Sequence, residues 1–376
     1  MKTLNMKIKI LLITIADNFI CNGKARIHNF SIMVKPSILF STGFLIVAAI
    51  FFSCNNESST TSGAGDSFKE ATSNALPSWA DTPANRIISW VKLVTDTSSP
   101  DFIPIADRIA VFDNDGTLWP EQPVPNQAAF AFSNLRALAP KHPEWQKDPV
   151  LNGILKGDLD PMEKAGAKGL LKVLNASHTG QTEEAFNTAV SNWIDTAKDA
   201  KFNRLYKEVV YQPMVELLDY LRANGFKTFI VSGGGADFMR VWTEEAYGIA
   251  PYEVIGSYGQ AKYEVVEGKP VITKITGEFY NDDKAGKPVA IHRFIGKVPV
   301  FCGGNSDGDQ AMMQYTSGLK YKSMCMILHH TDSTREYAYD VKTVSGHLET
   351  ALAEAKERNW MVVDMKKDFK KIFAFQ

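Results

Sequence analysis

Short, largely apolar runs alternate along most of the chain with longer segments in which apolar residues recur at helical spacing. The runs at residues 109–112, 227–231, 298–302 and 323–328 are typical of buried strands. Strands that alternate with helices usually form a parallel sheet with helices on both faces. We therefore predict an α/β fold with three layers and a Rossmann-like parallel sheet.

The pattern also indicates several elements around this sheet. Thr82 and Pro83 suit the N-cap and first turn of a helix. Apolar residues at helical spacing predict a second helix over 214–221, and the chain should end in a helix over about 346–358. Residues 263–272 combine β-formers with a Glu-Gly-Lys-Pro turn, which predicts a β-hairpin.

A helical insert is expected between the first strand and the next core element. Residues 120–205 contain helical patterns at 127–138 and 162–174, and a third helix should start at Thr182, which is followed by two glutamates. The insert would form a cap over the sheet edge; the alternative is that these helices simply enlarge the core.

The N-terminal part of the chain has the features of an export signal. A basic flank, a short apolar run and small residues before Cys54 predict a signal peptide over 1–54 that resembles a bacterial lipobox, with the true start at Met33 as an option. Cys54 would carry the lipid. Residues 55–76 should be a flexible tether and 77–376 the folded body. A plain signal peptide or an uncleaved anchor are the alternatives.

Composition narrows the functional classes. The chain has 376 residues and a net charge of −1, so no basic surface for nucleic acid is indicated. Its four cysteines show neither CxxC spacing nor a Cys/His cluster, which argues against a zinc site. Cys302 and Cys325 fall in strand-like runs; we expect buried thiols, although adjacent strands would permit a disulfide bridge.

Candidate chemistry begins where the first predicted strand ends. Asp113 and Asp115 lie one residue apart directly after the apolar run and before a Gly-Thr turn. Two such carboxylates repel each other and are costly to desolvate, so they usually need a cation or a shared proton. An ordinary turn is the alternative, because Asp, Asn and Gly are common turn residues.

Three later stretches favour the catalytic interpretation. They are Ser232-Gly233, which follows the second strand, a lysine at a helix start, and the stretch 304–309 after the next strand. Lys287 is the preferred lysine because Pro288 suits a first helical turn; Lys284 is the rival.

Together, these four motifs resemble those of the haloacid dehalogenase superfamily, closest to its phosphoserine-phosphatase-like branch, over about residues 105–330. The resemblance implies that Asp113 attacks phosphorus and forms an acyl phosphate. It implies that Asp115 protonates the leaving oxygen and later deprotonates the attacking water. Family members that cleave carbon–halogen bonds lack this second Asp, so Asp115 indicates phosphate esters.

The same resemblance assigns the remaining site residues. The Ser232 hydroxyl and the Gly233 N–H would hold phosphate oxygens, and Lys287 would offset their charge. A Mg²⁺ ion would be bound by the Asp113 carboxylate, the Asp115 backbone carbonyl, Asn305 and Asp309.

The fourth motif departs from the family pattern. Asn305 stands where the family usually has Asp, which removes a negative charge from the expected metal site. Asp307 is the substitute ligand if the loop is offset. The departure bears on metal affinity more than on reaction type.

The expected protein is an exported, lipid-anchored, Mg²⁺-dependent phosphomonoesterase of small organic phosphates outside the cytoplasm, on the periplasmic side or at the outer membrane. The alternatives are a phosphotransferase or phosphonatase on the same fold and a non-catalytic ligand-binding lipoprotein. Further polar and aromatic residues follow the first and last strands; each is expected more often in a structural or solvated role than in ligand contact: Trp119, Glu121, Gln122, His329, His330 and Arg335.

Overall fold

The computed structural model describes residues 75–318, 320–343 and 345–376. The predicted signal peptide and almost all of the predicted tether lie outside these residues. Within the described part of the chain, no helix combines the length and apolarity needed to cross a bilayer.

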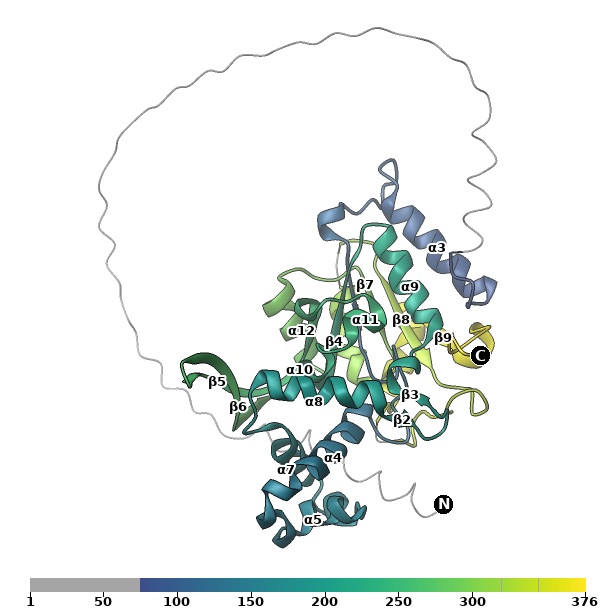
Figure 1. The fold of residues 1–376 in the computed structure, drawn as a ribbon. Coiled ribbons are helices and arrows are strands. Elements are labelled where there is room, and N and C mark those ends of the chain that lie inside the picture. Colours follow the sequence, from purple (N-terminus) through teal and green to yellow (C-terminus); the bar gives the residue numbers. More distant parts are fainter. Residues whose placement is uncertain (1–74, 319, 344) are drawn as a thin grey trace, which may run out of the picture.

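A seven-stranded sheet in the order β6-β5-β4-β1-β7-β8-β9 forms the centre of the protein (Figure 1). β6 runs antiparallel to β5, and every other neighbouring pair is parallel. This confirms the predicted α/β class. The strands are β1 (Ile109–Phe112), β4 (Lys227–Gly235), β5 (Val254–Val266), β6 (Lys269–Tyr280), β7 (Phe301–Gly304), β8 (Met324–His329) and β9 (Met361–Asp364).

Both faces of the sheet are buried at the central strands β1, β7 and β8, as their continuous apolar sequences require. In β1, Ala110 and Phe112 belong to one core cluster, whereas Ile109 and Val111 belong to the other. The first face packs against α3 (Asp81–Thr95), α9 (Gln212–Ala223), α10 (Ala236–Met239) and α11 (Thr243–Tyr247). The second packs against α12 (Gly286–Ala290), the π-helical turn Ile291–Ile295, α13 (Gln310–Ser317) and α14 (Thr350–Arg358).

The helical insert after β1 is confirmed. Its first helices pack around a small core of their own that includes Phe132, Leu135 and Trp145, whereas Phe186 and Trp193, in its last helix, belong to the main core cluster. The elements of the insert are α4 (Asn126–Leu138), α5 (Pro149–Lys156), α6 (Asp160–Ala165), α7 (Ala167–His178), α8 (Glu183–Thr196), β2 (Lys198–Asp199) and β3 (Arg204–Leu205). The single helix predicted over 162–174 is wrong, because Gly166, at φ +63°, separates two helices. Thr182 caps α8 as predicted and accepts a hydrogen bond from the Ala185 N–H at 3.2 Å.

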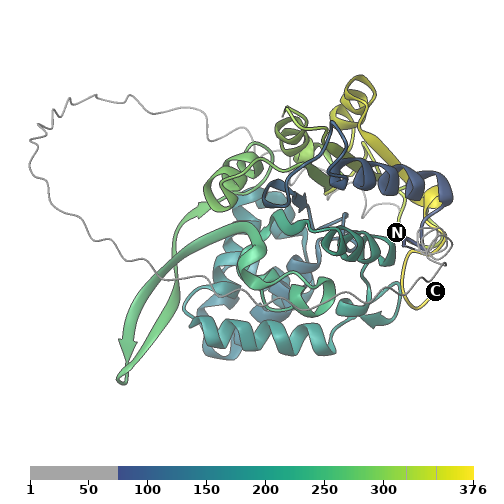
Figure 2. The same cartoon turned by 90° about the horizontal axis from the view of Figure 1, so that it is seen from above.

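The predicted hairpin is confirmed and is longer than expected. β5 and β6 project from the body as a long two-stranded arm (Figure 2). Glu267 and Gly268 both have positive φ at its tip, as a type I′ turn requires. At its base, β6 contacts the cap: the Gly180 N–H donates to the Lys274 carbonyl, and the Lys274 N–H donates to the Gln181 carbonyl.

The ends of the chain differ most from the prediction. α3 starts at Asp81, with Ala80 rather than Thr82 at the N-cap position. α14 starts at Thr350 rather than near 346, and β9 and α15 (Met365–Asp368) follow it unpredicted. The remaining short turns of 3-10 helix are Ile105–Asp107, Ala139–Lys141, Pro143–Lys147, Tyr206–Glu208, Pro251–Glu253 and Asp307–Asp309.

Candidate active site

Three loops leave the same edge of the sheet from neighbouring strands. Phe112, the last residue of β1, is in register with Ile230 of β4 and Gly303 of β7. The Asp113 N–H donates to the Gly303 carbonyl at 3.0 Å, which extends the pairing into the loops. The carboxyl ends of parallel strands thus bring the predicted motifs together.

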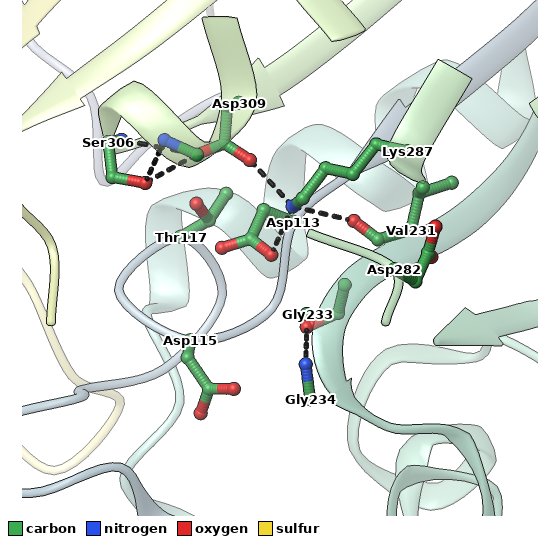
Figure 3. Close-up of polar contacts among 12 residues, drawn as sticks. Asp113, Asp115, Thr117, Val231, Gly233, Gly234, Asp282, Lys287, Ser306 and Asp309 are labelled. Carbon is green, nitrogen blue, oxygen red and sulfur yellow. Dashed lines mark hydrogen bonds and ion pairs between the residues drawn. The ribbon is translucent and has the colours of Figure 1, made fainter. Parts of the chain in front are cut away.

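The Lys287 ammonium joins these loops. Its Nζ lies 2.7 Å from Asp113 Oδ1 and 2.6 Å from Asp309 Oδ1, and it donates to the Val231 carbonyl at 2.9 Å (Figure 3). The Lys287 side chain is 2% exposed, whereas Lys284 is exposed. The structure therefore places Lys287, not Lys284, at the site.

The charges of these three side chains depend on one another. Burial alone would lower the pKa of Lys287, but the carboxylates of Asp113 and Asp309 hold it above its ordinary value, so the ammonium is charged. Burial raises the pKa of Asp113, and Lys287 opposes that shift. A buried charge needs such pairing, because one left alone costs several kcal/mol, roughly 3–5 when a partner is removed.

Asp115 occupies a different environment from Asp113, on the other side of the loop from Lys287 (Figure 3). Its Oδ1 accepts a hydrogen bond from Trp119 Nε1 at 2.8 Å, and Trp119 stacks on Trp242 with ring centroids 4.3 Å apart. Burial raises the pKa of Asp115 to about 6, although the Trp119 N–H opposes that shift. A carboxyl with this pKa is suited to both donating and accepting a proton near neutral pH.

The glycine-rich end of β4, residues 232–235, lies against Asp115. A Cβ at Gly234 would lie 3.1 Å from Asp115 Oδ2, so a larger residue there would require the carboxylate to shift by a few tenths of an ångström. Ser232 Oγ accepts from the Gly234 N–H at 3.0 Å, which leaves its O–H free to donate. The Gly233 carbonyl accepts from Ser257 Oγ at 2.8 Å, and the Gly235 N–H donates to Gln127 Oε1 at 2.7 Å.

The polar side chains of the loop after β7 make different contacts. Asp307 caps α14: its carboxylate accepts from the N–H groups of Glu349, Thr350 and Ala351. These hydrogen bonds lower the pKa of Asp307 despite its partial burial. Asp307 therefore does not replace Asn305 at the site.

Asp309 and Asn305 lie closer to residues 113–119, which we call the nucleophile loop because it contains the predicted nucleophile Asp113. Asp309 Oδ1 contacts Lys287, and its Oδ2 accepts from the N–H groups of Asn305 and Ser306 at 3.0 and 3.1 Å. Asp309 thus organises the loop and the lysine with both oxygens. Asn305 Oδ1 accepts from Thr117 Oγ1 at 3.3 Å.

The oxygen atoms at this site can be compared with the ligands that a divalent cation requires. Within the described ranges, no three His, Cys, Asp or Glu side chains come together in a metal-binding arrangement. The available oxygens are one from Asp113, the Asn305 amide oxygen and the Asp115 carbonyl. The fourth predicted ligand, Asp309, already uses Oδ1 on Lys287 and Oδ2 on the N–H groups of Asn305 and Ser306. An all-oxygen set with few carboxylates fits Mg²⁺, which keeps several waters and binds substrate phosphate.

A buried polar layer behind the nucleophile loop contains two of the polar residues that follow the first and last predicted strands, Glu121 and His330. His330 donates from Nε2 to the Gly116 carbonyl at 2.7 Å, and its Nδ1 lies 3.1 Å from Glu336 Oε2. Glu121 accepts from Asn305 Nδ2 at 2.5 Å, and burial raises its pKa to about 8. Both side chains hold the loop in place.

The other polar and aromatic residues that follow the first and last strands also make contacts within the protein. Trp119 supports Asp115, and Gln122 Nε2 donates to the Ser345 carbonyl at 3.0 Å. Arg335 pairs with Asp332 and donates to backbone carbonyls in the C-terminal segment. His329 is half-buried at the end of β8.

Sequence reasoning missed Asp282, which the structure buries near Lys287 (Figure 3). Neither of its carboxylate oxygens has a hydrogen-bond partner within the described part of the chain. Burial raises its pKa to about 7, and Lys287 opposes the shift. A turn-like Asn-Asp-Asp-Lys stretch carries no local signal for such burial.

The sequence profile described as haloacid dehalogenase-like hydrolase matches residues 110–314, more than half of the chain. No curated protein matches the sequence.

Several solved structures are similar at low identity. A protein of unknown function from Anaerococcus prevotii is 15% identical with a TM-score of 0.46, and the match covers 72% of this chain and 97% of that one. A phosphoserine phosphohydrolase-like protein from Francisella tularensis is 15% identical with a TM-score of 0.33, covering 66% and 98%. A probable phosphoserine phosphatase from Vibrio cholerae is 15% identical with a TM-score of 0.33, covering 64% and 62%.

Proposed function

Because the chain belongs to the haloacid dehalogenase-like hydrolase family, we propose that it is a Mg²⁺-dependent phosphomonoesterase that acts through an aspartyl-phosphate. The observation that supports this most is the Lys287 ammonium held between Asp113 and Asp309, at 2.7 and 2.6 Å. It keeps one oxygen of Asp113 fixed and places a positive charge beside the point where a dianionic phosphate would arrive.

In the first step, an Asp113 carboxylate oxygen attacks phosphorus and the bond from phosphorus to the ester oxygen breaks. Asp115 donates its proton to the departing oxygen, which leaves as an alcohol. In the second step, Asp115 takes a proton from water as the water oxygen attacks phosphorus, and the bond to Asp113 breaks. Phosphate leaves and both carboxyl groups return to their starting states.

The surrounding residues serve these steps. The Ser232 O–H and the Gly233 N–H would donate to phosphate oxygens, and Trp119 holds Asp115 in place. A bound Mg²⁺, held by Asp113, Asn305 and the Asp115 carbonyl, would neutralise part of the phosphate charge.

Release of phosphate tests the proposal. The purified full chain should hydrolyse a generic aryl phosphate with Mg²⁺, and either EDTA or Asp113→Asn should abolish the release. Asp219→Asn, on the exposed surface of α9, is the matched control and should retain activity. Hydrolysis that survives both EDTA and Asp113→Asn would contradict the mechanism.

We further propose that the enzyme acts outside the cytoplasm while anchored by a lipid on Cys54. The support is the basic and apolar pattern that precedes Cys54, together with the polar segment that follows it. The full chain should appear in the membrane fraction of a bacterial host, and Cys54→Ala should release it. A Cys54→Ala variant that stays with the membrane would contradict the lipid anchor. Small organic phosphates are the substrates that fit such a location.

A further inference from the structure

Glu121 is a buried carboxylate that the steps above do not use. It lies just after the nucleophile loop and is 3% exposed. It accepts hydrogen bonds from Asn305 Nδ2 at 2.5 Å, from the Tyr339 hydroxyl at 2.9 Å and from Ser345 Oγ. None of these partners carries a charge. A carboxylate kept in such a place costs free energy, which calls for a compensating role.

The backbone is shaped around this carboxylate. Gly116 in the nucleophile loop has φ +77°, and a Cβ there would lie 2.3 Å from Glu121 Oε1. Gly346 has φ +72°, and its Cβ would lie 2.2 Å from the same oxygen. Two loops far apart in sequence therefore close on Glu121 through glycines, and larger residues would displace it.

The hydrogen bonds of Asn305 fix which way its amide points. Its Nδ2 donates to Glu121, and its Oδ1 accepts from Thr117 Oγ1 at 3.3 Å. Because an ionised carboxylate only accepts, this orientation, with the nitrogen toward Glu121 and the oxygen toward the nucleophile loop, is the one that ionised Glu121 favours. Glu121 thus presents the one amide atom that can bind a cation.

We propose that Glu121 is a positioning residue of the Mg²⁺ site, which orients the Asn305 oxygen and, in its ionised form, supplies from the second layer a negative charge that the amide lacks. Residues of this second layer tune metal affinity through the ligands that they hold. The proposal rests on the proposed Mg²⁺-dependent function. It explains how a site with an amide ligand retains its attraction for a divalent cation.

Mg²⁺ affinity tests the proposal without an activity assay. A ligand that binds only the native state raises the unfolding temperature with its concentration, so a thermal titration of the full chain with MgCl₂ yields an apparent Kd. Glu121→Gln keeps the shape and a hydrogen-bonding oxygen but removes the charge. It should weaken Mg²⁺ binding by about 10–100-fold. Glu357→Gln, on the exposed face of α14, is the matched control and should leave the Kd unchanged.

A charge exchange separates positioning from a merely structural role. Asn305→Asp places two carboxylates side by side and should destabilise the metal-free protein while strengthening Mg²⁺ binding. The double variant Glu121→Gln/Asn305→Asp moves the charge from one side chain to its neighbour, and its Kd should return to within about 3-fold of the wild-type value. A purely structural Glu121 gives no reason for this rescue.

Each outcome decides one claim. A wild-type protein whose unfolding temperature does not respond to Mg²⁺ contradicts the proposed function. If the wild-type protein responds and Glu121→Gln responds equally, the inference about Glu121 is wrong. If Glu121→Gln weakens binding or fails to fold, the double variant decides: recovered affinity supports positioning, and lost affinity overturns it.

Discussion

Replacement of Lys287 by Met tests the electrostatic core of the site. The substitution removes an ammonium that contacts Asp113 at 2.7 Å, Asp309 at 2.6 Å and the Val231 carbonyl at 2.9 Å, and it fills a similar volume. Loss of one member of a buried ion pair costs about 3–5 kcal/mol. An unpartnered buried carbonyl costs about 1–3 kcal/mol. These contributions overlap, so we expect the free energy of unfolding to fall by about 4 kcal/mol at pH 8.

This loss of stability should depend on pH, and the charges at the site determine the direction of the dependence. Burial already raises the pKa of Asp113, and removal of Lys287 raises it further, so the native variant binds up to one proton more than the native wild type. Each such proton contributes about 1.4 kcal/mol per pH unit. Because burial raises the pKa of Asp113 in the wild type to about 8, this difference in bound protons arises mainly above that pH. The deficit should therefore shrink by up to about 2 kcal/mol between pH 9.5 and pH 7.5 and change little at lower pH.

Urea unfolding in EDTA, followed by tryptophan fluorescence, measures both quantities, and the m-value should stay unchanged. Lys284→Met is the matched control: its side chain is exposed, so the free energy of unfolding should change by less than about 0.5 kcal/mol. A deficit below about 1 kcal/mol at pH 8, or one that does not vary with pH, would refute this reasoning.

Three further predictions concern single side chains. Asp115→Asn should lower kcat at least about 100-fold. In the wild type, kcat/KM should fall above a pH of about 6, because the first step needs protonated Asp115. A flat pH profile would contradict this role. Asp282→Asn should raise the free energy of unfolding in urea by up to about 4 kcal/mol at pH 8 and by only about 2 kcal/mol at pH 5. At pH 5 the unpartnered carboxyl, with its pKa of about 7, is neutral in the native wild type but still ionised in the unfolded chain. Gly116→Ala should lower the free energy of unfolding by more than the roughly 1 kcal/mol expected for Gly157→Ala. Both glycines have φ near +78°, but only at Gly116 would the added Cβ lie 2.1 Å from Asn305 Nδ2. Equal losses of stability in the two variants would contradict this prediction.

Local sequence was sufficient to locate the strand ends and the chemistry that follows them. Asp113, Ser232 and Asn305 directly follow, or end, apolar runs, so pattern and function coincide in the same short stretches. The helix-start argument favoured Lys287 over Lys284. The decisive difference is that the Lys287 side chain is buried and the Lys284 side chain is exposed, which the sequence alone does not reveal.

Other features depend on contacts between distant segments. Glu121 receives hydrogen bonds from the loop after β7 and from the loop before α14, and no local pattern encodes that convergence. Asp307 and Asn305 differ by two positions, yet only one caps α14, which the sequence of the loop alone does not reveal. β9 is short and has an exposed Val362, so its pattern resembles that of a loop.

The most direct test of the mechanism is the chemical state of Asp113 during turnover. The wild-type enzyme, mixed with an aryl phosphate and Mg²⁺ and quenched in acid, should carry a phosphoryl group on the peptide that contains Asp113, and hydroxylamine should remove it as it does an acyl phosphate. Asp115→Asn should accumulate the same species if its base role limits the second step. An enzyme that turns over substrate with no phosphorylated Asp113, or with the label on another residue, would contradict the account.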